Sequence, residues 1–206
     1  MERGVNPIFP LPLFLDEAQD DEYTEVQKEL TIAKNELKFN DIGSYMILNE
    51  DPFSTNFLIH KKCNNTINLI NKTVDKFLKS LYGEYNTDGT VKWTIAESWM
   101  TKTNKGRCAR VHSHGAADIS GVYYLDTNGN DGNLILCNMH NQLQGNMLLC
   151  QIIEKGDIKL PLETGMIFLW PGQLKHYTLE NQTDHERVSV SFNINLSRKG
   201  FDTLYS

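Results

Sequence analysis

The second half of the chain is a series of short strand-like segments, and this pattern limits the fold more than any other feature of the sequence. After Gly89, runs rich in Val, Ile, Tyr and Trp alternate with turn residues such as Asn-Gly-Asn-Asp-Gly at 128–132 and Pro-Gly at 171–172. Eight or nine strands at this spacing predict a sandwich or a jelly-roll barrel. The strands are expected at 91–100, 109–114, 119–125, 134–137, 147–153, 158–160, 166–169, 176–179 and 188–196.

The first ninety residues are expected to be mostly helical. Apolar residues recur at three- and four-residue steps from Val26 to Leu37, after the acidic run 20–22. A second helix begins at Asn64 and ends near Gly83, and its apolar stripe comprises Ile67, Ile70, Val74, Phe77, Leu78 and Leu81. Because no linker interrupts the chain, we expect residues 1–206 to form one domain, with 1–90 as helical support and 91–196 as the jelly-roll core.

The last expected strand has one apolar and one polar face. Val188, Val190, Phe192, Ile194 and Leu196 alternate with Arg187, Ser189, Ser191, Asn193 and Asn195. If the apolar face packs beneath the helices, the polar face lines the inside of the barrel. A barrel interior with arginine and serine is suited to holding a ligand.

Composition excludes several classes of protein. A net charge of −6 over 206 residues argues against a broad phosphate-binding surface, so nucleic acid is not the expected partner. No apolar run approaches the roughly 18 residues of a membrane span, and no signal peptide is recognisable, which together predict a cytoplasmic protein. The cysteines form no CxxC pair and are expected to be reduced thiols; they are Cys63, Cys108, Cys137 and Cys150.

Three of the six histidines form a candidate metal site. His112 and His114 lie two residues apart, so on a strand they would point to the same face, and His176 opens a later strand. Neutral imidazoles suit zinc, copper, iron and nickel alike. Arg187 follows His176 and could anchor an anionic co-substrate. Asp118 is an alternative third ligand in place of His114, although a role in the turn before the next strand is the favoured interpretation.

The remaining histidines are expected outside the site. We expect His60 and His185 to be solvated, and His140 to lie in a loop. Trp93, Trp99 and Trp170 are expected in the core rather than on a substrate platform.

Three segments resemble the iron(II)- and 2-oxoglutarate-dependent oxygenases, most closely a bacterial and phage branch. These segments are His-Ser-His-Gly-Ala-Ala-Asp-Ile-Ser-Gly-Val-Tyr-Tyr-Leu at 112–125, Gly-Met-Ile-Phe-Leu-Trp-Pro-Gly-Gln-Leu-Lys-His at 165–176, and Arg-Val-Ser-Val-Ser-Phe-Asn at 187–193. The resemblance spans roughly residues 93–196. It implies a mainly β fold with N-terminal helices, in which a double-stranded β-helix, the jelly-roll or cupin-like barrel, carries helices on one sheet.

The resemblance also implies a cofactor, a co-substrate and a set of roles. His112 and His176 match the two histidine ligands of Fe(II), and Arg187 matches the residue that pairs with the distal carboxylate of 2-oxoglutarate. Ser189 and Tyr124 match residues beside the co-substrate. His114 departs from the superfamily, where Asp or Glu is usual, although the branch itself has histidine there. The implied activity is that of a dioxygenase, a hydroxylase of an unidentified substrate, that couples oxidative decarboxylation of 2-oxoglutarate to C–H oxidation with dioxygen.

Two other functions remain open at this point. One is a cupin-type metalloenzyme that uses three histidines without 2-oxoglutarate. The other is a non-catalytic jelly-roll module that binds metal or has a structural role. The sequence does not identify the primary substrate or the oligomeric state.

Overall fold

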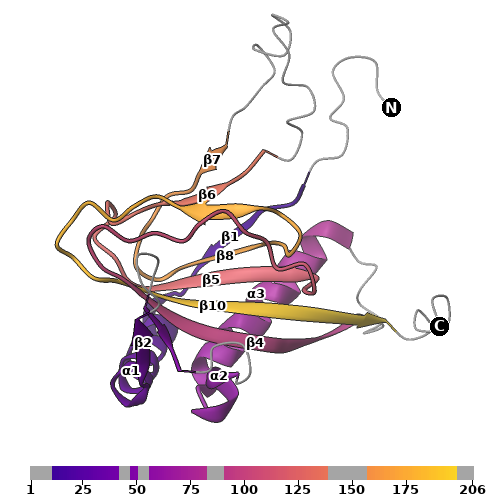
Figure 1. The fold of residues 1–206 in the computed structure, drawn as a ribbon. Coiled ribbons are helices and arrows are strands. Elements are labelled where there is room, and N and C mark those ends of the chain that lie inside the picture. The colour runs from indigo at the N-terminus through magenta and orange to yellow at the C-terminus, as the bar shows by residue number, and fades with distance from the viewer. Residues whose placement is uncertain (1–10, 42–46, 51–55, 83–90, 139–156, 199–206) are drawn as a thin grey trace, which may run out of the picture.

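Two antiparallel sheets face each other in the computed structural model, and helices cover the outer face of the larger sheet (Figure 1). The structure describes residues 11–41, 47–50, 56–82, 91–138 and 157–198. The larger sheet has the order β1 (Phe14–Glu17), β8 (Met166–Pro171), β5 (Ile119–Asp126), β10 (Arg187–Arg198), β4 (Val91–Thr103), β3 (Ile47–Asn49) and β2 (Phe39–Asp41). The smaller sheet has the order β7 (Ile158–Lys159), β6 (Leu134–Leu136) and β9 (His176–Thr178). The predicted mainly β fold with helices on one sheet is confirmed.

The helical layer consists of α1 (Asp20–Glu36), α2 (Phe57–His60) and α3 (Asn64–Tyr82). Both long helices were predicted. Glu29 of α1 accepts hydrogen bonds from the backbone N–H groups of Asn65 and Thr66, which satisfies free donors at the start of α3 and fixes the two helices against each other. The predicted stripe on α3 is correct up to Leu78, but Leu81 is 45% exposed because the covered part of the helix ends before it.

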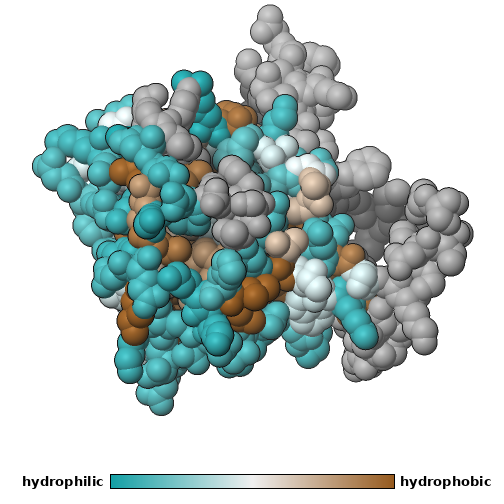
Figure 2. All heavy atoms as spheres, turned by 60° about the horizontal axis from the view of Figure 1, so that its bottom comes forward, coloured by the Kyte–Doolittle hydropathy of each residue, from teal (hydrophilic) through white to brown (hydrophobic). Residues whose placement is uncertain are grey.

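The outer surface of the helical layer is mainly hydrophilic (Figure 2). Its large exposed apolar residues, Ile32, Ile59 and Leu81, come from three different helices. None of the helices in the described ranges is long and apolar enough to cross a bilayer.

The two faces of β10 pack as the alternation predicted. Val188, Val190, Phe192 and Ile194 are fully buried against the helices in the main core. Gly121 on the neighbouring strand β5 makes room for this packing, since a Cβ atom there would overlap the ring of Phe192. The opposite face of β10 turns toward the smaller sheet, where a second apolar cluster fills the space between the sheets. This inner space contains the candidate site.

The predicted strand at 109–114 is wrong. The segment makes only an isolated bridge, between His112 and His176, and forms no continuous ladder. The backbone N–H of Ala109 donates to the hydroxyl of Thr178, and that of His114 donates to the carbonyl of Gly172 in a turn. Because these donors bond to a side chain and to a turn, the ladder is interrupted on both sides of His112.

Three short strands were not predicted in the N-terminal part, namely β1, β2 and β3. Each has only three or four residues, so its alternation was too brief to be distinguished from a loop. The expected strand at 147–153, His140 and Cys150 lie outside the described residues.

Candidate metal centre

The three predicted histidines meet at one end of the cavity between the sheets. The candidate ligand atoms of His112, His114 and His176 all lie within 4.8 Å of one another. Their ring centroids are 4.3 to 5.1 Å apart. No other group of three metal-binding side chains occurs within the described ranges.

Backbone hydrogen bonds bring these histidines together. His112 N–H donates to the carbonyl of His176 at 3.0 Å, and His176 N–H donates back to the carbonyl of His112 at 2.9 Å. His114 N–H donates to the carbonyl of Gly172 at 2.8 Å. A Cβ atom on Gly172 would collide with backbone atoms of Ala117 and His114, so only glycine allows the two loops to approach this closely.

Two of the rings have a defined hydrogen bond on Nδ1. His112 Nδ1 lies 2.6 Å from the carbonyl oxygen of Arg110, and His176 Nδ1 lies 2.9 Å from that of Leu174. In a neutral imidazole, an Nδ1–H that donates to a carbonyl leaves the lone pair of Nε2 free for a metal. Each bond also fixes the ring orientation.

Burial keeps two of the histidines neutral. Desolvation is the main cause that lowers the pKa of His176 to about 3; the neighbouring imidazoles of His112 and His114 add to the shift, and the hydrogen bond to Leu174 opposes it. Desolvation, followed by the proximity of His112, lowers the pKa of His114 to about 4. Neutral imidazoles at neutral pH are the form that binds a metal.

The donor set fits a first-row transition metal such as iron. Three imidazole nitrogens converge, and a site with only three protein ligands leaves coordination positions open. The structure groups His114, and not Asp118, with the other two histidines. The carboxylate of Asp118 instead accepts a hydrogen bond from Leu196 N–H at 2.6 Å, in an exposed position.

Arg187 lies at the other end of the cavity and is only 3% exposed. Its Nη1 donates to the carbonyls of Asp131 and Gly132, and its Nη2 donates to the hydroxyl of Thr103 at 3.1 Å. Its Nε is buried and has no hydrogen-bond partner. A buried guanidinium donor without an acceptor is unfavourable. The Nε–H of Arg187 is therefore suited to bonding an acceptor supplied by a ligand.

The loop that holds Arg187 is itself tightly bonded. The carboxylate of Asp131 is fully buried and accepts hydrogen bonds from the hydroxyl of Thr127 and the backbone N–H of Asn128.

The prediction that His185 is solvated needs correction, because its Nε2 lies 3.2 Å from the carboxylate of Asp126 and 3.7 Å from that of Asp131. The His185 ring therefore lies beside the carboxylates of Asp126 and Asp131, just before β10 begins.

Tyr124 and Ser189 lie between the two ends. They are paired across β5 and β10, and both line the cavity. Burial raises the pKa of Tyr124 to about 12, although the charge of Arg187 opposes this shift. The phenol therefore keeps its proton at neutral pH and remains a hydrogen-bond donor.

Two tryptophans of the core also belong to the site. Trp99 and Trp170 are buried, as predicted, and both also line the cavity, with ring centroids 5.3 Å from that of His114 and 4.9 Å from that of His176. Their positions on the inner faces of β4 and β8 carry the signal that could have found them, since cross-strand register pairs Ser191 with Trp99, and Ser120 with Trp170.

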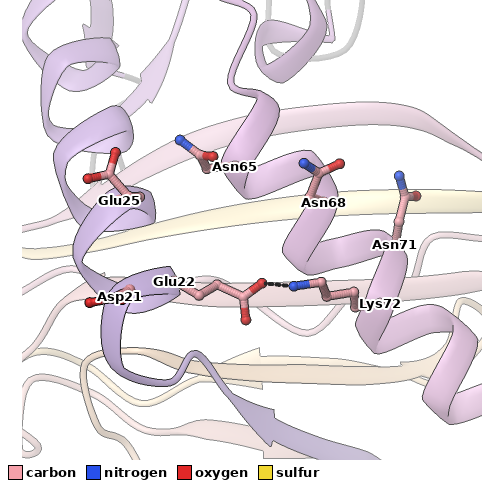
Figure 3. A pocket seen from close by; sticks show the side chains of 7 residues that line it. All are labelled: Asp21, Glu22, Glu25, Asn65, Asn68, Asn71 and Lys72. Carbon is pink, nitrogen blue, oxygen red and sulfur yellow. Dashed lines mark hydrogen bonds and ion pairs between the residues drawn. The ribbon is translucent and has the colours of Figure 1, made fainter.

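A larger hollow than the histidine cavity lies elsewhere on the described surface. A groove of about 410 Å³ runs between α1 and α3, lined by acidic and asparagine side chains and by an ion pair of Glu22 with Lys72 (Figure 3). It shares no residue with the histidine cavity, which measures about 60 Å³. Its side chains are solvated and do not converge, so the smaller cavity is the better candidate site.

Comparison with known proteins agrees with this geometry. Residues 97–193 match the family model described as "Putative 2OG-Fe(II) oxygenase". The matched segment contains the three histidines, Tyr124, Arg187 and Ser189. The comparison with curated proteins found no match.

Several solved structures share the fold. An oxidoreductase of the 2OG-Fe(II) oxygenase family from Burkholderia pseudomallei has 12% identity and a TM-score of 0.58, over 82% of this chain and 77% of that one. HygX from Streptomyces hygroscopicus, solved with nickel, 2-oxoglutarate and hygromycin B, has 11% identity and a TM-score of 0.56, over 90% and 83%. A Pseudomonas putida prolyl-4-hydroxylase has 13% identity and a TM-score of 0.53, over 89% and 92%.

Such low identities establish the fold alone. Residues 97–193 match the model of the 2OG-Fe(II) oxygenases, and the chain has the double-stranded β-helix fold of the solved oxygenases.

Proposed function

We propose that this protein is an Fe(II)- and 2-oxoglutarate-dependent dioxygenase that oxidises a C–H bond of a primary substrate. One observation carries the proposal: a cluster of three imidazoles and a buried arginine with an unpartnered donor line the same cavity. The first feature is suited to a metal, and the second to a carboxylate of a small co-substrate.

His112, His114 and His176 would hold the metal. Iron bound there supplies the redox chemistry that converts 2-oxoglutarate and dioxygen into succinate and carbon dioxide while the substrate is oxidised. The three ligands are neutral, so the site keeps the full positive charge of the cation and favours a dianionic co-substrate.

Arg187 would bind the far carboxylate of 2-oxoglutarate. The three acceptors already present engage Nη1 and one side of Nη2, which leaves Nε–H and a second Nη2 hydrogen for a ligand. Two parallel donors of this kind match the two oxygens of a carboxylate. The hydroxyls of Ser189 and Tyr124 would add hydrogen bonds beside this pair.

The walls of the cavity exclude water and limit what can enter. Val122, Leu134, Trp99 and Trp170 contribute apolar surface, which strengthens the electrostatic interactions inside. A cavity of about 60 Å³ is small beside the roughly 300–1,000 Å³ of sites for drug-sized ligands. We therefore expect the bulk of the primary substrate to lie outside it, with only the reacting group near the histidines.

Among the described residues no carboxylate belongs to the histidine cluster, and this favours one alternative, a three-histidine metalloenzyme that does not use 2-oxoglutarate. Dependence of oxygen consumption on added 2-oxoglutarate separates the two activities. The cytoplasmic location stays a prediction, and the free thiols of Cys63, Cys108 and Cys137 agree with it.

Anaerobic reconstitution tests the proposal. We expect Fe(II) and 2-oxoglutarate together to give a weak visible charge-transfer band, and the admission of oxygen to release succinate. The same experiment with the Arg187→Ala variant should give little band at matched co-substrate concentration. A protein that binds iron but produces no band and no succinate would contradict the proposed activity.

A further inference from the structure

A row of polar side chains continues the inner face of the larger sheet beyond the histidines. Asn193 on β10 is paired with Glu97 on β4 and with Ser120 on β5, so these three residues share one face. The amide nitrogen of Asn193 lies 3.5 Å from His114. Arg187 is six residues earlier in the same strand, about 20 Å away. The row therefore adjoins the histidine end of the cavity, opposite the arginine end.

On the far side of this row, the inner face of the sheet is open to solvent. The next pair on that face, Thr94 with Asn195, is exposed. The alternate residues Ile95 and Ile194 turn the other way and pack against the helical core. A substrate too large for the cavity of about 60 Å³ can rest on this open face and still place its reacting group at the metal.

Glu97 is half-buried and is held in the row by one oxygen. Its Oε2 accepts a hydrogen bond of 2.7 Å from Asn193 Nδ2, and Ser120 donates to Oδ1 of Asn193 at 3.0 Å. Because Asn193 and Ser120 are almost fully buried, these bonds fix the amide and, through it, the carboxylate. Within the described ranges, Glu97 makes no other hydrogen bond and no ion pair. Its second oxygen is therefore available to a ligand.

A β-bulge lies directly beside Glu97. Asn193 pairs with Glu97, whereas the next residue of β10 pairs with Ile95. Ala96 is left without a partner on β10, and its small side chain is exposed. A bulge bends its strand and re-aims the neighbouring side chains, and bulges are frequent next to active sites. This irregularity agrees with a role for Glu97 in binding rather than in the regular packing of the sheet.

The chemistry of the carboxylate indicates the kind of group that it binds. A carboxylate accepts hydrogen bonds and donates none, and a positively charged donor bonds to it more strongly than a neutral one. Partial burial reduces the solvent screening that makes exposed ion pairs weak. We propose that Glu97 binds an ammonium or guanidinium group of the primary substrate, which is then a cationic molecule lying across the open inner face of β4 and β10. This inference rests on the proposed function, because it assigns the substrate class of the same site.

The test uses n-butylguanidinium as a probe of the Co(II)-loaded protein with 2-oxoglutarate, kept anaerobic. N-Butylurea is the control probe, because it has nearly the same shape without the charge. Paramagnetic Co(II) enhances the nuclear relaxation of a molecule that is bound near it, so cations attached elsewhere on this acidic protein do not contribute. We expect butylguanidinium to bind about 10-fold more tightly than butylurea.

Two variants that each replace a glutamate by glutamine assign this preference. Glu97→Gln keeps an oxygen acceptor for Asn193, so the protein should stay folded and bind Co(II). It should weaken butylguanidinium binding about 3- to 10-fold and leave butylurea binding unchanged. The control Glu163→Gln removes the same charge from an exposed carboxylate just before β8, at the arginine end of the sheet. It should change neither affinity by more than about twofold.

Three results would overturn the inference in a protein that still binds Co(II) and 2-oxoglutarate. These are equal binding of the two probes, no binding of butylguanidinium, and a preference for butylguanidinium that persists in Glu97→Gln. Failure of the unaltered protein to bind Co(II) or 2-oxoglutarate would instead overturn the proposed function, and this inference with it.

Discussion

The histidine end and the arginine end of the cavity are held by different kinds of structure. His112 and His114 lie in an irregular segment, and His176 begins a strand of three residues. Their positions depend on a few hydrogen bonds between loops that are distant in sequence. Arg187 begins a strand of twelve residues that is paired on both sides, and three acceptors hold its guanidinium.

This difference indicates which end of the cavity depends on its ligand for structural stability. The arginine end has the preformed geometry that reduces the entropic cost of binding a small anion. The histidine end has fewer restraints, so a bound metal would stabilise the loops as well as take part in chemistry. The two ends should therefore respond separately to substitution.

Removal of one imidazole should have the largest effect. We expect His176→Ala to abolish metal uptake, because the remaining two ligands cannot retain the ion and the ring contact with Trp170 is lost. Elemental analysis after reconstitution measures this directly. The control is His60→Ala, which removes an exposed histidine of α2. This variant should bind iron normally. Full iron occupancy in His176→Ala would remove that residue from the ligand set.

Removal of the guanidinium should affect only the other end. We expect Arg187→Ala to weaken 2-oxoglutarate binding by about 3–5 kcal/mol, since a buried carboxylate would lose its charged partner, while metal affinity stays the same. Arg187→Lys should recover only part of the loss, because an ammonium group cannot reproduce the paired donors. Anaerobic calorimetry on the iron-loaded protein gives both affinities. Unchanged 2-oxoglutarate affinity in Arg187→Ala would exclude this role.

The same contrast explains what the sequence could predict. Alternation along 187–196 predicted both faces of β10, because a long strand with one buried face has only one acceptable orientation. The helices at 20–36 and 64–82 followed equally from their apolar stripes. These features are local, so a single segment carries the whole signal.

The histidine end depended on contacts that no local pattern contains. The segment 109–114 was predicted as a strand, yet its donors go to Thr178 and to a turn carbonyl. The contact between the Asn193 amide and His114, 3.5 Å apart, likewise depends on the position that β10 takes in the sheet. Sequence motifs could identify the three histidines as candidate ligands, but only the fold shows which groups contact each ring.

Low pH should reduce the free energy of unfolding of the metal-free protein, because two histidines of the site are buried in the neutral form. The unfolded chain takes up protons on its histidines below about pH 6.5, whereas the folded protein keeps His114 and His176 neutral down to about pH 4 and about pH 3. The unfolded state therefore binds more protons in this window, and stability must fall as pH decreases from 6.5 toward 4. We expect a loss of roughly 2–4 kcal/mol from the two groups.

Urea unfolding at pH 7 and pH 4.5 measures this loss. The double variant His114→Gln, His176→Gln should lose clearly less stability over the same interval, because it lacks both buried imidazoles. Identical pH dependence in the two proteins would show that other groups control the acid response.

The smallest expected effect lies in the loop beneath Arg187, and it tests whether that end is truly preformed. Gly132 has φ +97°, and a Cβ atom there would overlap the carbonyl of Leu179 and come within 3.2 Å of Arg187 Nη1. Gly106 has a similar φ of +78° but open space around it. Both Gly→Ala variants carry the backbone strain of about 1 kcal/mol, so the difference between them isolates the steric conflict.

We expect Gly132→Ala to cost about 1–3 kcal/mol more than Gly106→Ala in urea unfolding, and it alone should weaken 2-oxoglutarate binding. The displaced carbonyls of Asp131 and Gly132 would no longer hold the guanidinium with its free edge toward the cavity. Equal losses of stability, with equal co-substrate affinity, would mean that Arg187 keeps its position without this loop. The arginine end would then be no more preorganised than the histidine end.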